Sequence, residues 1–107
     1  MQKFRTLELA VEFYDEVEKL HIPNHLNGQL LRAAASISLN LSEGNAKFSF
    51  KDKKRIYQIA MGSLRESQTA LRLAKVNDPK LNQLADHLGA SIYKLMRASE
   101  AKGAVEN

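Results

Sequence analysis

The chain has 107 residues, no cysteine and a formal net charge of +4. Its length fits a single domain covering residues 1–107. The lack of cysteine excludes disulfide scaffolds, thiolate metal sites and cysteine nucleophiles. Glu8 and Glu12 interrupt the apolar stretch that a signal peptide would need, and no segment has the composition of a membrane span. We therefore expect a cytoplasmic protein with no membrane partner.

Apolar residues recur with helical spacing from one end of the chain to the other. A first helix is predicted from Thr6, as its N-cap, to Leu20, because Pro23 cannot continue a helix. A second helix is predicted to begin at Asn24, which would be its N-cap. It is predicted to stop at Gly44-Asn45, because glycine and asparagine tolerate the left-handed backbone conformation that ends many helices.

The second half of the chain predicts two longer helices. Ser49 is expected to cap a helix over residues 50–76, which Asn77 would close. Asp78 followed by proline then predicts the start of a fourth helix over residues 79–103. Four helices with short connections favour an all-α fold, an antiparallel up-down-up-down four-helix bundle.

The second helix has more apolar surface than a bundle core requires. Besides its core stripe, it carries Leu31, Ala35 and Leu39 on another face. An amphipathic bundle with a few exposed apolar residues is the simple interpretation. A contiguous apolar patch is uncommon on a monomer, so we expect this face to be a homo-oligomer interface.

A polar ladder follows a third face of the same helix. Its members are Arg32, Ser36, Asn40 and Glu43, spaced so that all four align. The ladder either fixes helix packing through hydrogen bonds or forms a small polar site. We favour the structural role, because the ladder contains no His, Tyr or Lys for proton transfer at neutral pH.

Charge is unevenly distributed along the chain. Residues 47–75 contain eight basic and two acidic residues. The predicted basic stripe on the third helix, away from the core, consists of Lys51, Lys54, Arg55, Arg65 and Arg72.

Such a stripe could follow the phosphate backbone of RNA or DNA. Because no exposed aromatic residue is interleaved on that helix, base stacking and sequence readout are not expected. The alternative is a solvated face, or one neutralised by the acidic face of the first helix (Glu8, Glu12, Asp15) in the same or a neighbouring subunit.

The sequence offers little for metal binding or catalysis. Glu18 and His21 form one Glu-x-x-His pair, but di-iron bundles need two such pairs and further carboxylates. The nucleotide-binding and hydrolase motifs that rest on glycine spacing are absent from the sequence. We therefore expect no metal, no cofactor and no catalytic residue, and do not expect an enzyme.

Residues 31–49 resemble the signature of the four-helix-bundle proteins called rRNA intervening-sequence proteins. The family pattern of Gln, Arg-Ala-Ala, Ser-Ile, Asn and Glu-Gly falls here on Gln29, Arg32-Ala33-Ala34, Ser36-Ile37, Asn40 and Glu43-Gly44. A second family pattern, Ala-x-Gly-Ser-Leu-x-Glu, is similar to residues 60–66. The chain departs from the family in having Ser38 where many members have proline, which should leave the second helix straighter, and Leu31 in place of a usual arginine.

The resemblance implies a ring-shaped homopentamer of four-helix bundles. It also implies a relationship to the accessory variability determinant of diversity-generating retroelements, a basic pentamer that works with a reverse transcriptase and nucleic acid. The expected partners are thus a second copy of the chain, RNA or DNA, and a reverse transcriptase or other protein. No catalytic residues follow from the resemblance.

Overall fold

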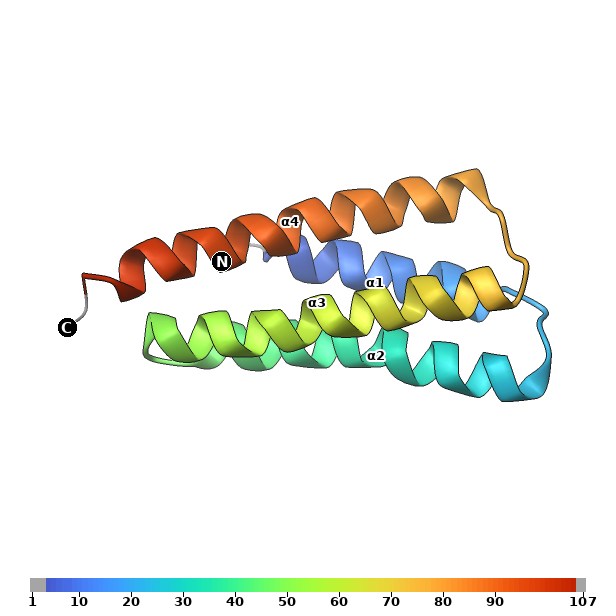
Figure 1. The fold of residues 1–107 in the computed structure, drawn as a ribbon, viewed down its shortest axis with the longest axis horizontal. Coiled ribbons are helices and arrows are strands. Elements are labelled where there is room, and N and C mark those ends of the chain that lie inside the picture. The colour runs from blue at the N-terminus through green and yellow to red at the C-terminus, as the bar shows by residue number, and fades with distance from the viewer. Residues whose placement is uncertain (1–3, 106–107) are drawn as a thin grey trace.

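The computed structural model describes residues 4–105 and consists of four helices joined by short connections (Figure 1). No strand occurs in this part of the chain, so the all-α prediction is confirmed. The helices are α1 (Arg5–Glu18), α2 (Asn24–Ala46), α3 (Phe50–Leu73) and α4 (Pro79–Gly103).

The helices alternate in direction and form a closed square, as the bundle prediction required. Each helix packs against its neighbours in the sequence, and α4 returns to pack against α1. The backbones of the diagonal pairs α1/α3 and α2/α4 lie farther apart than those of neighbouring helices. The α2–α3 turn lies at one end of the bundle, and the α1–α2 and α3–α4 connections lie at the other (Figure 1).

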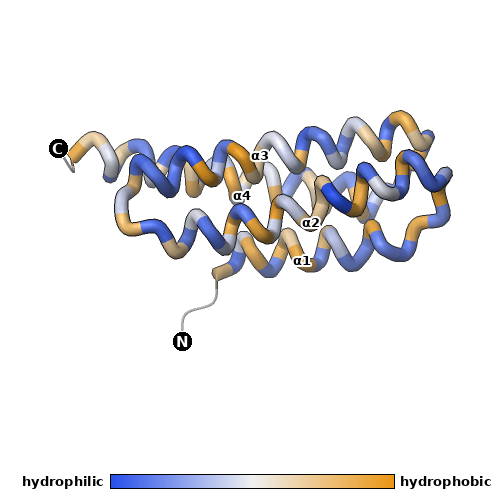
Figure 2. Tube along the Cα trace, turned by 90° about the horizontal axis from the view of Figure 1, so that it is seen from below, coloured by the Kyte–Doolittle hydropathy of each residue, from blue (hydrophilic) through white to orange (hydrophobic). Residues whose placement is uncertain are grey.

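The apolar stripes of all four helices meet along the bundle axis. Apolar and polar residues alternate along each helix, and no helix is apolar throughout (Figure 2). Within residues 4–105, no helix combines the length and the hydropathy needed to cross a bilayer. The largest apolar side chains of the core that are almost completely inaccessible to water are Phe13, Val17, Leu30, Ile37, Leu41, Leu64, Leu81, Leu88 and Ile92.

The first helix is much shorter than the others. It has 14 residues, whereas α2, α3 and α4 have 23, 24 and 25. Both views show that α1 begins well inside the α2–α3 turn and does not reach that end of the bundle (Figures 1 and 2). The bundle therefore has four helices along most of its length and three at the α2–α3 turn.

Two of the four predicted N-caps are confirmed. The Ser49 side chain accepts a hydrogen bond from the backbone N–H of Asp52, and Asp78 accepts two from the first turn of α4. The predictions for Thr6 and Asn24 are wrong. Thr6 lies inside α1, is buried, and its hydroxyl is hydrogen-bonded to that of Ser91 on α4. Pro23 occupies the cap position of α2, so Asn24 is already helical.

The third helix ends three residues earlier than predicted. Val76 N–H donates to the Leu71 carbonyl and Lys75 N–H to the Arg72 carbonyl, which is the Schellman arrangement at a helix C-terminus. This arrangement requires a left-handed residue, and Lys75 supplies it with φ of 62°. Neither Val76 nor Asn77 is helical, because the chain has already reversed at Lys75.

The second helix continues past its predicted stop. It includes Gly44 and Asn45 and ends at Ala46, and Gly44 has no left-handed conformation. It also runs without interruption through Ser38, which agrees with the absence of proline there. The role of Gly44 is therefore in packing, not in ending the helix.

Candidate nucleic-acid interface

The polar ladder of α2 connects α2 to α3. Arg32 forms an ion pair with Glu66 of α3. One turn later, the hydroxyls of Ser36 and Ser63 are hydrogen-bonded at 2.8 Å. The Asn40 amide donates to the Ser36 carbonyl oxygen at 2.8 Å and to its hydroxyl at 3.0 Å.

The fourth member of the ladder acts differently. The Glu43 carboxylate lies 3.7 Å from the Lys47 ammonium, one turn on at the exposed end of α2, and forms no bond to α3 within residues 4–105. Arg32 and Ser36 thus join two helices, Asn40 supports Ser36, and Glu43 stays at the surface. These bonds engage the polar groups of Arg32, Ser36 and Asn40 with one another and with α3, which favours the structural role.

The ladder places the two signature segments of the sequence against each other. Glu66 and Ser63 of α3 belong to the second pattern, and they bind Arg32 and Ser36 of the first. Both patterns can be recognised in the sequence, but their contact cannot. Helical spacing shows which residues share a face of one helix, and does not show which other helix that face packs against.

The basic stripe lies on the outer side of α3, mostly toward α4, with its members in different environments. The Lys54 ammonium is 3.6 Å from the Glu100 carboxylate of α4. Arg65 is exposed and donates at 2.8 Å to the amide oxygen of Gln68. Arg55 and Arg72 are exposed, and the side chain of neither forms a hydrogen bond or ion pair within residues 4–105. Lys51 is exposed and has an interaction of its own.

On α3 itself neither Phe50 nor Tyr57 is exposed, as the sequence predicted, but two exposed aromatic residues lie on the segments beside this helix. Phe48, in the turn before α3, is fully exposed, and Tyr93 of α4 is 52% exposed. A Cβ atom added to Gly89 of α4 would lie 4.0 Å from an Arg65 guanidinium nitrogen. Tyr93 follows Gly89 by one helical turn, so it lies along the α4 face that Arg65 approaches. Sequence reasoning missed Tyr93 because it considered α3 alone.

The acidic face of α1 and the basic stripe lie on helices that are diagonal in the bundle, since α1 packs beside α2 and α4. Of the α1 acids, Glu16 turns toward α4, where Lys80 donates to it at 2.8 Å. Hydrogen bonds from Lys80 and then Lys19 hold the pKa of the Glu16 carboxyl below its ordinary value of 4.5. The same bond to Glu16 raises the pKa of Lys80 above 10.5.

The surplus apolar face of α2 forms a shallow groove with α1. Leu39 is 69% exposed and Ala35 is partly exposed, whereas Leu31 is partly buried against the core. Val11 and Tyr14 of α1 line the other side of this groove of about 220 Å³. The predicted face is therefore continued by α1, and Leu31 contributes less to it than Leu39.

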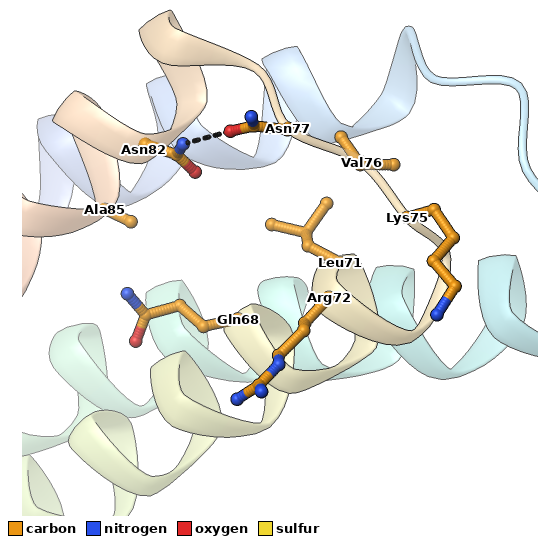
Figure 3. A pocket seen from close by; sticks show the side chains of 8 residues that line it. All are labelled: Gln68, Leu71, Arg72, Lys75, Val76, Asn77, Asn82 and Ala85. Atoms are coloured by element: carbon orange, nitrogen blue, oxygen red, sulfur yellow. Dashed lines mark hydrogen bonds between the residues drawn. The ribbon is translucent and has the colours of Figure 1, made fainter.

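A larger groove of about 460 Å³ lies between α3 and α4, where the connection joins them. Figure 3 shows its lining, which includes Arg72 at the end of the basic stripe. The lining also contains three amide side chains and Lys75. Helical periodicity could not place this groove, because the groove depends on the early reversal of the chain at Lys75.

Ionisable groups do not gather into a metal site in the described part of the chain. No group of three or more His, Asp or Glu residues that could hold a metal ion occurs within residues 4–105. Burial raises the pKa of the Tyr57 phenol above 10.0, but this residue lies on α3 in the core, apart from the Glu16–Lys80 pair of α1 and α4.

These features define an antiparallel four-helix bundle in which polar pairs join α2 to α3 and the outer side of α3 is basic. The model of the 23S rRNA-intervening sequence protein family matches residues 2–100, and the chain belongs to that family. The resemblance drawn from the two signature segments is thereby confirmed. No curated protein matches the chain.

Proposed function

We propose that this protein is a non-enzymatic, self-associating bundle that binds nucleic acid weakly and without sequence preference through α3. One observation carries the proposal. Arg55, Arg65 and Arg72 are exposed and lack any carboxylate partner within residues 4–105. Lys54 of the same stripe and Lys80 of α4, by contrast, do have such partners.

Arginine is well suited to phosphate. Its planar guanidinium group can donate two parallel hydrogen bonds to phosphate oxygens, and it stays charged at every accessible pH. At a rise of about 1.5 Å per residue, Arg55 and Arg65 are about 15 Å apart along α3, and Arg72 is about 10 Å further on. A straight helix that meets a curved backbone would bring about two or three of these groups into contact at once.

Self-association would strengthen such weak contacts. The groove formed by Leu39, Ala35 and Val11 is the surface we assign to contact between copies, in a ring and most simply a pentamer. In a ring the basic stripe of α3 repeats on every subunit. One nucleic acid molecule could then engage several stripes, so that its overall affinity exceeds that of a single contact.

A salt titration with duplex DNA and structured RNA tests the proposal. With two or three phosphate contacts per subunit, the log–log salt slope for duplex DNA should be about −2 to −3 per subunit engaged. Arg55→Glu with Arg65→Glu should abolish binding and leave the helical content unchanged, since both residues are exposed.

Arg5→Glu with Lys94→Glu is the matched control for the charge change. Both residues are exposed, and they lie on α1 and α4. This control should retain most of the binding. Equal loss of binding in both double variants would show that only net charge matters, and would count against a site on α3.

The second candidate is a structural or protein-interaction ring whose partner is a protein, such as a reverse transcriptase. The complete exposure of Phe48 at the tip of the α2–α3 hairpin favours it, because a fully exposed aromatic residue is a suitable anchor for another protein. This function predicts no shift of RNA or DNA by the wild-type protein even at about 50 mM salt, where electrostatic attraction is less screened than at physiological ionic strength.

A further inference from the structure

The groove at the α3–α4 connection has an apolar floor. Leu71 and Val76 are brought together by the Schellman arrangement, and Ala85 of α4 completes the floor. A floor of this kind can receive the flat face of a planar ring. At about 460 Å³, the groove lies within the range of about 300–1,000 Å³ that small-molecule sites occupy.

Two amide side chains on the walls are held in place by a hydrogen bond each. The Gln68 amide oxygen accepts from Arg65 at 2.8 Å, and its NH₂ group has no partner within residues 4–105. The Asn82 NH₂ group donates to Asn77 at 3.1 Å, and its side-chain carbonyl oxygen has no partner in the same range. Figure 3 shows the Gln68 amide reaching from α3 toward Ala85, and Asn82 on α4 above it. The groove thus offers one donor and one acceptor from opposite walls.

Two cations stand at the other rim of the groove. Figure 3 shows the side chains of Arg72 and Lys75 leaving α3 on the side away from the Asn77–Asn82 pair. Both residues are exposed, and neither has an ion pair within residues 4–105. Lys75 has a left-handed backbone with φ of 62°, a conformation that is strained for a residue other than glycine.

We propose that this groove binds one unpaired nucleotide of a nucleic acid strand. The base would lie on Leu71 and Val76, with its edge hydrogen-bonded to the Gln68 amide and the Asn82 carbonyl. The phosphate would meet Arg72 and Lys75. This inference rests on the proposed function, because Arg72 belongs to both the groove and the basic stripe, so a strand that follows α3 reaches the groove directly.

A base inside a duplex does not fit this description. Its pairing edge is already used and both of its faces are stacked, whereas an unpaired base exposes both edge and face. Bringing a paired base into the groove would require unpairing and unstacking it, which is energetically unfavourable. The groove would therefore bind single strands, loops or strand ends in preference to duplex. The basic stripe alone would not distinguish them, because it contacts only phosphates.

The test compares a single-stranded oligonucleotide, RNA or DNA, with a duplex of the same length at one salt concentration. The wild-type protein should bind the single strand about tenfold more tightly, an effect within the range reported for one stacked base. Asn82→Leu should lower single-strand binding to the duplex level without changing duplex binding. Gln83→Leu is the matched control, because Gln83 is exposed on the same turn and does not line the groove, and it should keep the preference.

Two further probes separate the alternatives. An oligonucleotide of abasic sites, which has phosphates but no bases, should bind the wild type no better than duplex does. Free adenosine monophosphate should bind far more weakly than the strand, and equal affinity would overturn the assignment to a strand in favour of a free nucleotide.

The outcomes distinguish this inference from the proposed function. Equal binding of single strand and duplex, both lost in the Arg55→Glu, Arg65→Glu variant, overturns the nucleotide site and leaves the basic stripe intact. Loss of the preference in Gln83→Leu as well as in Asn82→Leu also overturns the site. Failure to bind either probe overturns both proposals.

Discussion

Gly44 of α2 lies directly against the ring of Tyr57 on α3. A Cβ atom at position 44 would be 2.7 Å from Cε1 of that ring and 2.9 Å from Cδ1. Both distances are shorter than those between carbon atoms that are not bonded to each other. The hydrogen atom of glycine lets the two helices come together at the α2–α3 end, where α1 contributes nothing. The glycine of the Glu-Gly signature is thus explained by packing between helices.

Gly44→Ala should destabilise the protein. Overpacking of this kind costs about 1–3 kcal/mol, and the helix preference of alanine over glycine returns only about 1 kcal/mol. Tyr57 and Ile56 are both buried, so neither can easily move away. The free energy of unfolding, measured by urea denaturation, should therefore fall.

Gly28→Ala is the matched control on the same helix. Apart from the adjoining residues and backbone of α2 itself, no described atom lies within 4 Å of a Cβ at that position. Only the helix preference then operates, and stability should rise by about 0.5–1 kcal/mol. A gain in stability for Gly44→Ala equal to that for Gly28→Ala would contradict the close contact with Tyr57.

Lys75→Gly should stabilise the protein by about 1 kcal/mol, because glycine adopts the left-handed conformation without the Cβ clash. Lys75→Ala removes the same charge but keeps the strain, so it should bring no such gain. Thermal melts of the two variants give the comparison. If both variants melt alike, the left-handed φ of 62° is not a source of strain.

The Ser36–Ser63 pair should show energetic coupling between α2 and α3. Each single change to alanine leaves one hydroxyl without its partner across the helices, whereas the double change removes both polar groups. The double variant should lose less stability than the sum of the single variants, with a coupling energy of about 0.5–1.5 kcal/mol.

Asn40→Ala should cost less than either serine variant. Among the residues that the structure describes, its amide bonds only to Ser36 on its own helix, and alanine is the better helix former. A loss of stability larger than that of Ser63→Ala would show that Asn40 has a role beyond supporting Ser36.

The Glu16–Lys80 pair should make stability depend on pH in the acid range. The pKa of the Glu16 carboxyl is lowered in the folded protein, so its contribution is complete above the ordinary value of 4.5 and is lost as the pH falls through the folded pKa. Melting temperatures taken from neutral pH to below 4.5 should fall less steeply in Glu16→Gln than in wild type. Glu18→Gln, which changes an exposed carboxylate on the same helix, should keep the wild-type slope.

Leu39→Lys should lower the assembly state while helical content survives, because it places a charge in the groove between α1 and α2. Leu73→Lys is the control. Leu73 is 60% exposed on α3 and lies outside that groove, so this variant should assemble like wild type. Light scattering that finds a monomer for the wild-type protein at micromolar concentration would contradict self-association through Leu39.

Most of the fold could be predicted from the sequence, because it depends on local chemistry. The periodic apolar residues and the caps at Ser49 and Asp78 determine structure through interactions with residues nearby in the sequence. These local signals predict the boundaries of α3 and α4 to within three residues. Thr6 has the chemistry of an N-cap, but its hydroxyl is hydrogen-bonded to Ser91, 85 residues away, which no local pattern indicates. Lys75 was missed because a left-handed lysine has no local signal comparable to that of glycine.

The site was predicted in its parts but not in its connections. Each member of the basic stripe was named, and the structure places them on the outer side of α3. Tyr93, Gln68 and Asn82 were not named, since they matter only because α4 lies beside α3. They lie close to Arg65 and Arg72 because α3 and α4 pack together, and the helical periodicity of one segment does not predict which segments pack together.

The shortness of α1 has a consequence for how the molecule opens. A helix of 14 residues whose backbone packs beside α2 and α4 can detach while the long α2–α3 hairpin and its α4 contacts remain. Local openings of this kind have lower free energies than global unfolding. Amide hydrogens of α1 should therefore exchange with solvent before those at the centre of α3. Each opening would also expose buried core residues of α2, such as Leu30 and Ile37, to solvent. The α1 helix of a neighbouring copy could then pack against this transient apolar surface, so that two copies exchange their first helices.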